Sequence, residues 1–269
     1  MTTTPLPASP VSTTRQHRVP AVARSVSAIA TTPVKGFALT SPKQVMVGAD
    51  GVADNRRFAL LNEQGERLRS GKHAWPCTVA AEFDEQSRRL GMRLADGTEL
   101  AATIELGDAM QFDYHGVLVG GRVVRGPWAE RLSALAGIAV QLVMLDRPGQ
   151  VQGQPVTLVS EASLGTIAEE AGENVDPRRF RMLFHVDGCA PHEEDEWLHL
   201  RVRVGDAVVR IVERVERCVV TTRDPETGTR DIDTLAILER YRGTIDFGVG
   251  ASVVEPGLVA VGDPVELVD

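Results

Sequence analysis

The sequence predicts a mainly β protein of the α+β class, in which a few helices pack against strands. Short apolar runs recur along the chain with turn residues between them, a spacing typical of a barrel or a sandwich. Only three segments combine a helical pattern with start and stop residues. The hydrophobic content of 43% and the charged content of 25% are ordinary for a globular protein. A length of 269 residues suffices for one large or two small domains.

The first half, taken as residues 25–148, is predicted to consist of strands joined by hairpins. Turn sequences at residues 62–65 and 96–97 separate apolar runs, and each predicts a hairpin. A short helix is predicted over residues 129–136, opened by Pro127 and closed by Gly137. Strands are expected at residues 26–35, 45–47, 58–61, 79–83, 90–94, 99–104 and 140–145.

The second half, taken as residues 149–269, contains the other two predicted helices. Ser160 can cap a helix over residues 161–171, and Gly172 would end it. A third helix is predicted over residues 235–241, before Gly243. Strands are expected at residues 156–159, 182–186, 198–204 and 207–215, with a closing pair around residues 259–267.

Residues 1–24 are rich in Thr, Ser, Pro and Ala, lack apolar periodicity, and predict a disordered tail. The net charge of −8 and pI of about 5.4 argue against a general nucleic-acid surface, which needs a basic field. No apolar run approaches the roughly 18 residues that span a bilayer. Cys77, Cys189 and Cys218 are few and far apart, which disfavours a disulfide framework and favours a reducing, cytoplasmic location. Without a Cys-x-x-Cys pair, an iron–sulfur cluster is not expected in this chain.

The stretch with the most chemical content surrounds Cys218. It follows the apolar alternation at residues 207–215 and precedes a turn sequence at residues 224–228. Arg214, Arg217 and Arg223 flank this cysteine, and nearby guanidinium groups favour the thiolate form that binds metals or attacks electrophiles. On spacing alone, the alternative is a small residue packed beneath a sheet edge, as most free cysteines are.

The run Arg217-Cys218-Val219-Val220-Thr221-Thr222, with Asp224-Pro225-Glu226-Thr227-Gly228 after it, resembles the cysteine motif of MOSC-domain proteins. The resemblance is greatest to the branch that holds the mitochondrial amidoxime-reducing component and its bacterial counterparts. Further matching segments cover roughly residues 26–269; they are residues 32–35, 55–58, 158–164, 179–181, 187–188, 194–197 and 261–265. The resemblance implies an N-terminal β-barrel-like domain packed with a MOSC β-barrel domain that carries a few helices.

The resemblance also implies a site that binds molybdenum cofactor, a metal–pterin with a phosphate. Cys218 would be the catalytic residue and the metal ligand, since soft thiolate suits such a metal. Cationic side chains would hold the phosphate, and the helix start after Ser160 could add backbone donors. The predicted cofactor-binding residues are Lys35, Arg56, Ser160, Arg181, Arg217 and Thr221. Pyridoxal phosphate binding is a further expectation, at the level of the wider family only.

By the same resemblance, the chain would reduce N-hydroxylated small molecules such as amidoximes, hydroxylamines or N-oxides. Because the chain lacks cysteines for an iron–sulfur centre, a separate electron-donor protein, a reductase or a ferredoxin-like partner, is implied. No nucleic-acid partner and no membrane association are expected.

Three positions depart from the family pattern. Gly36 stands where many members have serine, Leu183 where asparagine is usual, and Glu216 where the amidoxime-reducing branch has serine. Loss of an amide removes a hydrogen-bonding group, and a carboxylate repels an anionic ligand. The alternatives that stay open are a diverged enzyme on the same fold, a sulfur or cofactor carrier that uses Cys218 without molybdenum turnover, and a binding module without cofactor.

Overall fold

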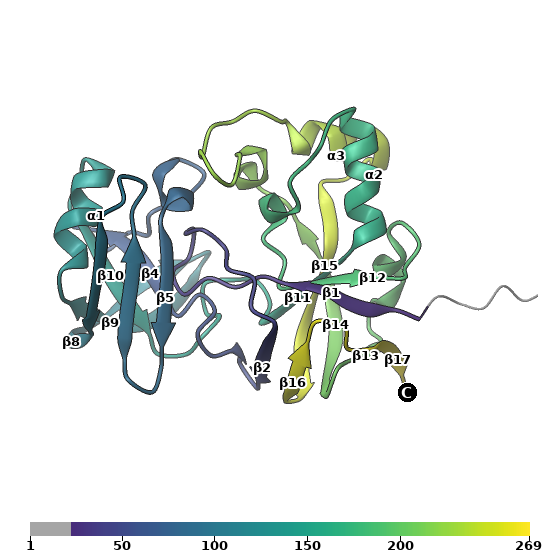
Figure 1. Ribbon diagram of the computed structural model, residues 1–269, viewed down its shortest axis with the longest axis horizontal. Coiled ribbons are helices and arrows are strands. Elements are labelled where there is room, and N and C mark those ends of the chain that lie inside the picture. Colours follow the sequence, from purple (N-terminus) through teal and green to yellow (C-terminus); the bar gives the residue numbers. More distant parts are fainter. Residues whose placement is uncertain (1–22) are drawn as a thin grey trace, which may run out of the picture.

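The computed structural model describes residues 23–269, so the tail predicted over residues 1–24 lies almost entirely outside the described residues. The described chain forms two lobes that lie side by side (Figure 1). Strands far outnumber helices, and the predicted mainly β class is confirmed. Among residues 23–269, no helix is long and apolar enough to cross a membrane.

The first lobe contains two antiparallel sheets and one helix. Its four-stranded sheet has the order β4-β10-β9-β8, and its three-stranded sheet has the order β5-β6-β7. Buried side chains of both sheets, with Trp128 and Leu132 of the helix, form one apolar core. Its elements are β4 (Phe58–Asn62), β5 (Ala80–Asp84), β6 (Arg89–Arg93), β7 (Glu99–Thr103), β8 (Glu105–Tyr114), β9 (Val117–Arg125), α1 (Trp128–Ala136) and β10 (Val140–Leu145).

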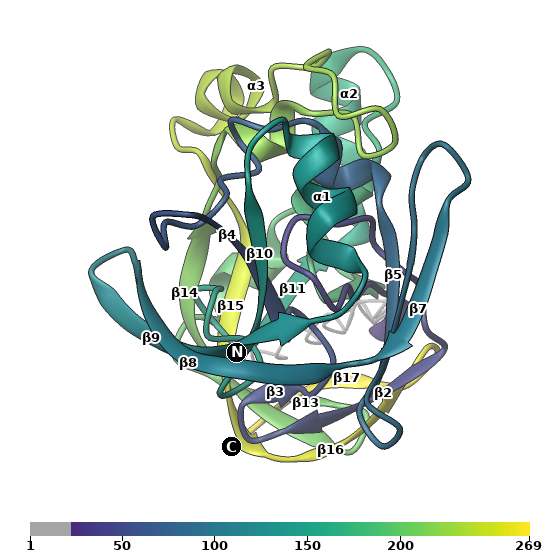
Figure 2. The same cartoon turned by 90° about the vertical axis from the view of Figure 1, so that its left-hand side faces the viewer.

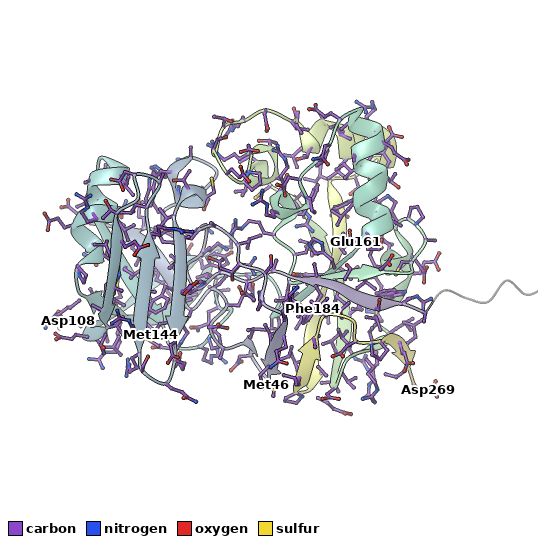
Figure 3. The ribbon with its side chains drawn as sticks, in the orientation of Figure 1. Met46, Asp108, Met144, Glu161, Phe184 and Asp269 are labelled. Carbon is purple, nitrogen blue, oxygen red and sulfur yellow. The ribbon has the colours of Figure 1, made fainter. Side chains whose placement is uncertain are left out.

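The second lobe is built on a seven-stranded sheet of order β1-β12-β11-β15-β14-β13-β17, with a small sheet of order β16-β2-β3 beside it. Helices α2 and α3 pack together above one end of this sheet (Figure 1). Phe184, fully buried, lies at the centre of this lobe, whereas Met144 belongs to the first (Figure 3). The elements are β1 (Ser25–Ile29), β2 (Gln44–Gly48), β3 (Gly51–Val52), β11 (Val156–Ser160), α2 (Glu161–Ala171), β12 (Phe184–Asp187), β13 (Arg201–Val204), β14 (Ala207–Glu216), α3 (Thr234–Arg242), β15 (Asp246–Glu255), β16 (Gly257–Ala260) and β17 (Val265–Val268).

The predicted division between residues 148 and 149 does not coincide with the boundary between the lobes, because strands from before residue 148 pair with strands of the second lobe. Strand β1 pairs with β12, where Ala28 lies opposite His185, and β2 pairs with β16, where Met46 lies opposite Leu258. Strands β1, β2 and β3 therefore contribute to the second lobe's core, whereas Val34 and Phe37, between β1 and β2, pack in the first lobe's core. The division into two domains stays a prediction, and strand pairing shows that the halves do not separate cleanly at that point.

All three predicted helices are present, and each ends at a glycine with a positive φ angle. The first strand ends earlier than predicted, at Ile29, because Thr31 turns to pair with Thr40 and Lys35 donates its backbone N–H to Phe58. The long β8–β9 hairpin, which sweeps across the first lobe in Figure 2, was not predicted. Strand β15 was also missed, because its two glycines, Gly248 and Gly250, interrupt the apolar pattern.

The start of α2 is held by a buried polar network. The Ser160 Oγ accepts the backbone N–H of Ser163 at 3.0 Å, and Glu194 accepts from the Ser160 N–H at 3.2 Å and from the Ser163 hydroxyl at 2.8 Å. Glu194 is 1% exposed, so these bonds satisfy groups that water does not reach. Strand β11 and helix α2 are thereby fastened to the loop that carries Glu194.

We expect Ser160→Ala to lower the free energy of unfolding by about 1–2 kcal/mol, because it removes the cap and leaves a buried N–H unpaired. Asp233→Ala is the matched control, since Asp233 caps α3 in the same way but is exposed. Its expected cost is about 0.5–1 kcal/mol. Urea unfolding of both variants makes the comparison, and equal costs would contradict a special role for the buried network.

Candidate functional site

A cavity of about 440 Å³ opens between the two lobes at the end of β14. The first lobe and the segment leading to it supply one wall, and the end of β14 with the loop before β12 supplies the other. The side chains that line it are mostly polar or cationic. They are Lys35, Gly36, Arg56, Ser70, Tyr114, His115, Gln152, Gly153, Thr157, Arg179, Phe180, Arg181, Met182, Val215, Glu216, Arg217, Cys218, Val220 and Thr221.

Cys218 lies on this cavity with an exposed side chain. Strand β14 ends at Glu216, and Cys218 begins the short 3-10 helix Val219–Thr222. The Cys218 carbonyl accepts from the Thr221 N–H and from the Thr221 hydroxyl, both at 3.1 Å. The same hydroxyl contacts that of Thr234 in α3 at 2.7 Å. The backbone around the cysteine is therefore fixed, while the thiol stays available to a ligand.

Lys35 reaches the cavity from the segment that joins the lobes. Its ammonium Nζ donates to the Tyr114 hydroxyl at 2.7 Å and to the Val151 carbonyl, and it lies 4.8 Å from the centre of the Tyr114 ring. Burial lowers the pKa of Lys35 well below its usual value, and the positive charges of Arg56 and other arginines add to this effect. A negative group in the cavity would have the opposite effect.

Arg56 and Arg181 both adopt left-handed backbone conformations, with φ angles of 51° and 53°. Arg56 donates to the Gln152 side-chain oxygen and, at 2.8 Å, to the Arg181 carbonyl. Arg181 donates to the Phe37 carbonyl at 2.7 Å. Burial lowers the pKa of Arg56 to about 10, and burial with the neighbouring Arg56 charge lowers the pKa of Arg181 to about 9.

Arg217, the residue before Cys218, is buried, with 7% of its surface exposed. Its guanidinium donates to the Phe247 carbonyl at 2.8 Å and to the Phe180 carbonyl at 2.9 Å, and contacts the Met182 sulfur at 2.7 Å. Burial lowers the pKa of Arg217 to about 9. These contacts tie the cysteine loop to the segment that carries Arg181, so Arg217 positions the cavity wall as well as charging it.

The cations of this cavity share a property that sets them apart from the neighbouring Arg179. Within residues 23–269, none of Lys35, Arg56, Arg181 and Arg217 pairs with a carboxylate; every partner is a carbonyl, an amide, a phenol or a thioether. Arg179, by contrast, makes two bonds of 2.7 and 2.6 Å to the Asp231 carboxylate. Buried charges are normally paired. The arrangement therefore favours an anion in the cavity.

Ser160 is the predicted site residue that the structure does not bring to the cavity. Its hydroxyl and N–H are both engaged in the network with Ser163 and Glu194. The first turn of α2 also holds Glu161, whose carboxylate accepts from the Ser27 hydroxyl at 2.6 Å. A carboxylate in this position already takes the negative charge that a helix start favours. Cofactor binding by the other predicted residues stays a prediction.

The three departures from the family pattern have different surroundings. Leu183 is 1% exposed and packs in the core of the second lobe, outside the cavity lining. Glu216 lines the cavity with an exposed carboxylate. Gly36 has a φ angle of 94°, and a Cβ there would lie 2.4 Å from the Ser70 hydroxyl oxygen. Ser70 therefore places a hydroxyl where a side chain at position 36 would otherwise stand.

We expect Gly36→Ser to lower the free energy of unfolding by about 2 kcal/mol, through both the positive φ angle and the clash with Ser70. Gly65→Ala is the matched control, because its φ angle is 75° and no atom lies within 4 Å of the added Cβ. Its expected cost is about 1 kcal/mol, from the backbone alone. Adding Ser70→Gly to Gly36→Ser should recover part of the loss in urea unfolding, and no recovery would contradict the steric account.

Sequence reasoning missed several cavity residues that lie far from the cysteine motif. Tyr114 and His115 are at the tip of the β8–β9 hairpin, and His115 Nε2 lies 2.9 Å from an Arg67 Nη2. Gln152 comes from the segment between the lobes. A hairpin tip and a connecting loop carry no periodic signal, so only the folded chain shows that they reach the site.

Metal-ligand residue types also gather at residues 185–195, in the second lobe. Several of them contact other side chains: His185 lies 3.4 Å from Glu161, His192 lies 2.8 Å from Arg242, and Glu193 accepts from Arg24 at 2.7 Å. Within the described part of the chain, no group of three or more His, Cys, Asp or Glu side chains is placed to hold a metal ion. The other ligands of a metal bound at Cys218 would therefore have to come from a cofactor.

The family model for the MOSC domain matches residues 137–266. Among curated proteins, mitochondrial amidoxime reducing component 2 of Rattus norvegicus is 36% identical over 123 residues, which is 41% of this chain and 36% of the relative. Mitochondrial amidoxime-reducing component 1 of Mus musculus is 32% identical over 134 residues, which is 45% of this chain and 39% of the relative. The chain thus matches little more than a third of the length of these relatives.

Among solved structures, the YUAD protein of Bacillus subtilis has a TM-score of 0.44 and 11% identity, covering 91% of this chain and 94% of that one. YiiM of Escherichia coli has a TM-score of 0.34 and 22% identity, covering 46% of this chain and 58% of that one.

Proposed function

We propose that this chain, which carries a MOSC domain over residues 137–266, binds molybdenum cofactor in the cavity between its lobes and reduces N-hydroxylated small molecules. Cys218 would be the protein's ligand to the metal. The curated relatives are named as amidoxime-reducing components, which supports the reaction class. Amidoximes, hydroxylamines and N-oxides are the substrates to test.

One observation carries the proposal. Lys35, Arg56, Arg181 and Arg217 are gathered at one cavity, and all their partners among the described residues are uncharged. An anionic pterin phosphate would supply the negative charge that these side chains lack, and arginine can hold a phosphate oxygen pair with two parallel bonds. Cys218 lies on the same cavity with an exposed thiol, so the residues present fit a ligand that combines phosphate with a thiophilic metal.

When bound, the cofactor would supply two-electron chemistry that accepts an oxygen atom from the substrate. The protein's own part is to hold and surround it. Arg56 and Arg181 would bind the anionic end, and Arg217 would keep the cysteine loop against the segment at Phe180 through its carbonyl contacts. Tyr114 holds Lys35 at the hairpin tip and keeps this wall of the cavity in place.

The exposed carboxylate of Glu216 adds one negative charge beside the cysteine. It faces a cavity with an excess of cations, so it reduces the positive charge without removing it. Glu216 would therefore favour substrates that are neutral or positively charged near the metal, as amidoximes are. Electrons would come from a separate donor protein.

The test is the molybdenum and pterin content of protein made in a host that synthesises the cofactor. We expect close to one equivalent of each, together with reduction of benzamidoxime by an artificial electron donor. Folded protein with neither metal nor pterin would contradict the proposal. A labile extra sulfur on Cys218, detected by mass spectrometry in metal-free protein, would instead favour the sulfur-carrier alternative.

A further inference from the structure

The tip of the β8–β9 hairpin places one phenol on the wall of the large cavity. Tyr114 is the last residue of β8 and lies opposite Val117 of β9, and the two residues between them, His115 and Gly116, both have positive φ angles. Such a two-residue turn follows the natural twist of a hairpin. The Asp113 carboxylate also accepts the Gly116 N–H at 3.0 Å. The tip is therefore short, and its geometry holds the Tyr114 ring at the cavity.

The Tyr114 hydroxyl has a hydrogen that is not used within the protein. Its oxygen accepts from the Lys35 ammonium at 2.7 Å, and no atom among residues 23–269 accepts the Tyr114 O–H in turn. The Arg67 guanidinium lies 4.5 Å from the centre of the ring, so a second positive charge faces the phenol. Nearby positive charges stabilise the phenolate that forms when a phenol loses its proton. Tyr114 can therefore donate a proton to a ligand in the cavity.

Tyr114 and Cys218 border the same space. Both line the large cavity, one from the first lobe and the other from the end of β14. Burial is the main cause that raises the pKa of Tyr114, and the negative charge of Cys218 adds to it. Charges influence each other in this way only when they are close. A substrate bound beside Cys218 would therefore lie in the space that Tyr114 faces.

Lys35 can replace the proton that Tyr114 gives away. Burial lowers the pKa of Lys35 well below its usual 10.5, whereas burial raises the pKa of Tyr114 above its usual 10.0. A proton therefore moves from the ammonium to a phenolate with a gain in free energy, along one hydrogen bond of 2.7 Å. The charged or titratable groups that face this pair are Arg56, Arg67, Arg181, His115 and Cys218.

His115, the other titratable group at the hairpin tip, is a weaker candidate for the same role. Its Nε2 lies 2.9 Å from an Arg67 Nη2, and the Arg67 charge is the main cause that lowers the pKa of His115. The imidazole is therefore neutral at pH 7. A neutral imidazole is a much weaker acid than the ammonium that donates to Tyr114.

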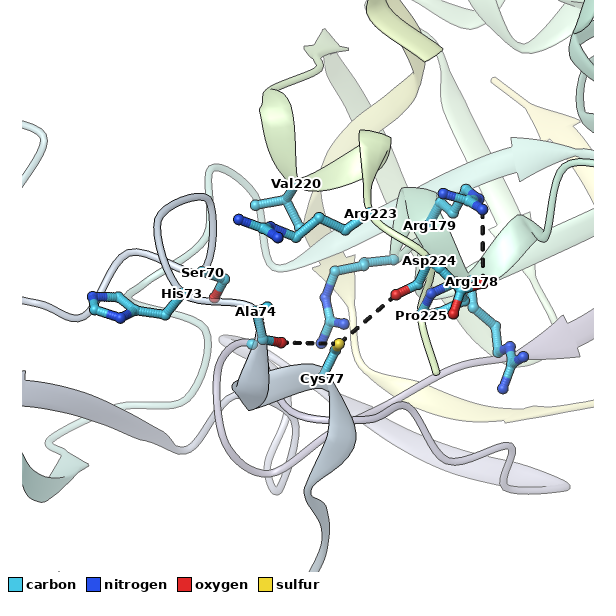
Figure 4. Close-up of a pocket in the computed structure, with 12 residues that line it drawn as sticks. Ser70, His73, Ala74, Cys77, Arg178, Arg179, Val220, Arg223, Asp224 and Pro225 are labelled. Atoms are coloured by element: carbon cyan, nitrogen blue, oxygen red, sulfur yellow. Dashed lines mark hydrogen bonds and ion pairs between the residues drawn. The ribbon is translucent and has the colours of Figure 1, made fainter. Parts of the chain in front are cut away.

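The cavity wall at the end of the cysteine loop offers no comparable proton donor. Figure 4 shows this region, where Cys77 and Ala74 of the first lobe lie below Val220 and Arg223. The space between them is about 20 Å³, which is room for a single water. The Cys77 thiol donates to the Ala74 carbonyl at 3.2 Å, and burial raises its pKa. Cys77 is also outside the lining of the large cavity.

We propose that Tyr114 is the catalytic acid of the reduction and that Lys35 supplies it with protons. This inference rests on the proposed function. Reduction of an amidoxime breaks the N–O bond and takes up two electrons from the donor protein and two protons. One proton goes from solvent to the nitrogen, and the other goes from Tyr114 to the oxygen, which leaves as water. The phenolate then takes a proton from the Lys35 ammonium, and solvent protonates the Lys35 amine again.

The pairing of Tyr114 with Lys35 is tested in cofactor-free protein. The chain has two tyrosines, so Tyr241→Phe protein made with tyrosine that carries carbon-13 at Cζ gives one signal, from Tyr114. As the pH rises, we expect its chemical shift to change where Lys35 loses its proton, well below 10.5. The change should be absent in Lys35→Met and present in Lys43→Met, whose lysine is exposed. The same change in Lys35→Met would overturn the proposal.

The proton transfer itself is tested in cofactor-loaded protein with an artificial electron donor. We expect Tyr114→Phe to lower kcat for benzamidoxime by about 10²-fold, with KM, molybdenum content and pterin content unchanged. The remaining activity should increase as the pH falls, because the proton must then come from solvent. Tyr241→Phe is the matched control, since Tyr241 lies in α3 outside the cavity lining, and it should keep the wild-type kcat.

Two outcomes of the kinetic test would overturn the proposal. One is a wild-type kcat in Tyr114→Phe, and the other is a loss of activity in proportion to a loss of molybdenum, which indicates a structural role. Wild-type protein without molybdenum would contradict the proposed function instead. The carbon-13 titration needs no metal, so it would still decide whether Lys35 and Tyr114 are coupled.

Discussion

Replacement of Cys218 by alanine should remove at least nine-tenths of the bound molybdenum and lower amidoxime reduction by a factor of about 10³ or more. The reason is that Cys218 is exposed on the cavity, and no set of three or more metal-ligand side chains among residues 23–269 could replace it. The measurement is metal content by mass spectrometry and turnover with an artificial electron donor. Pterin content is measured in the same samples, because the cationic wall is left intact.

Pterin should fall much less than metal in Cys218→Ala, since the phosphate contacts proposed for Arg56 and Arg181 would remain. Cys189→Ala is the matched control, because Cys189 packs against the core of the second lobe and is outside the cavity lining. It should keep both metal and activity. Full activity and full metal content in Cys218→Ala would rule out the cysteine as the ligand.

The elements that the sequence predicted well are those with local signals. Helices α1, α2 and α3 have capping residues and terminal glycines, and β14 has an apolar alternation that ends just before Cys218. The Asp224 turn is also local, since its carboxylate accepts from the N–H groups of Glu226 and Thr227. Such features depend on neighbours in the sequence, so they can be read from it.

The site depends on contacts between distant segments, and these the sequence could not supply. The Lys35 ammonium donates to Tyr114, which is 79 positions away in the sequence, and Arg56 donates to Gln152, which is 96 positions away. The motif at Ser160 matched the family pattern, yet its hydroxyl accepts the Ser163 N–H at the helix start and its own N–H donates to Glu194. A serine that caps a helix and a serine that binds phosphate have the same sequence signal. The position of Glu194, which accepts from the helix start, distinguishes the two roles here.

The pH dependence of stability gives the second large effect. We expect the ligand-free protein to become more stable as the pH rises from the lowered folded-state pKa of Lys35 towards pH 8.5. Burial lowers its pKa in the folded state, whereas the unfolded chain keeps the usual value of 10.5. Within the window between those two values the unfolded chain binds one more proton than the folded protein. The free energy of unfolding therefore rises with pH, by up to about 1.4 kcal/mol per pH unit.

Urea unfolding at several pH values measures this slope, and the range stops below the pKa values of about 9 that burial gives Arg181 and Arg217. Lys35→Met should flatten the slope, and Lys43→Met, at an exposed position, should leave it unchanged. A slope that survives in Lys35→Met would assign the effect to another group. Inorganic phosphate should stabilise the wild-type protein more at pH 6 than at pH 8.5, because an anion in the cavity favours the charged ammonium. The cavity cations would then lower the free energy of unfolding when no anion is bound, and the same cations would bind the anion when it is present. An anion-binding cavity therefore gains affinity for its ligand at the cost of stability in the ligand-free protein.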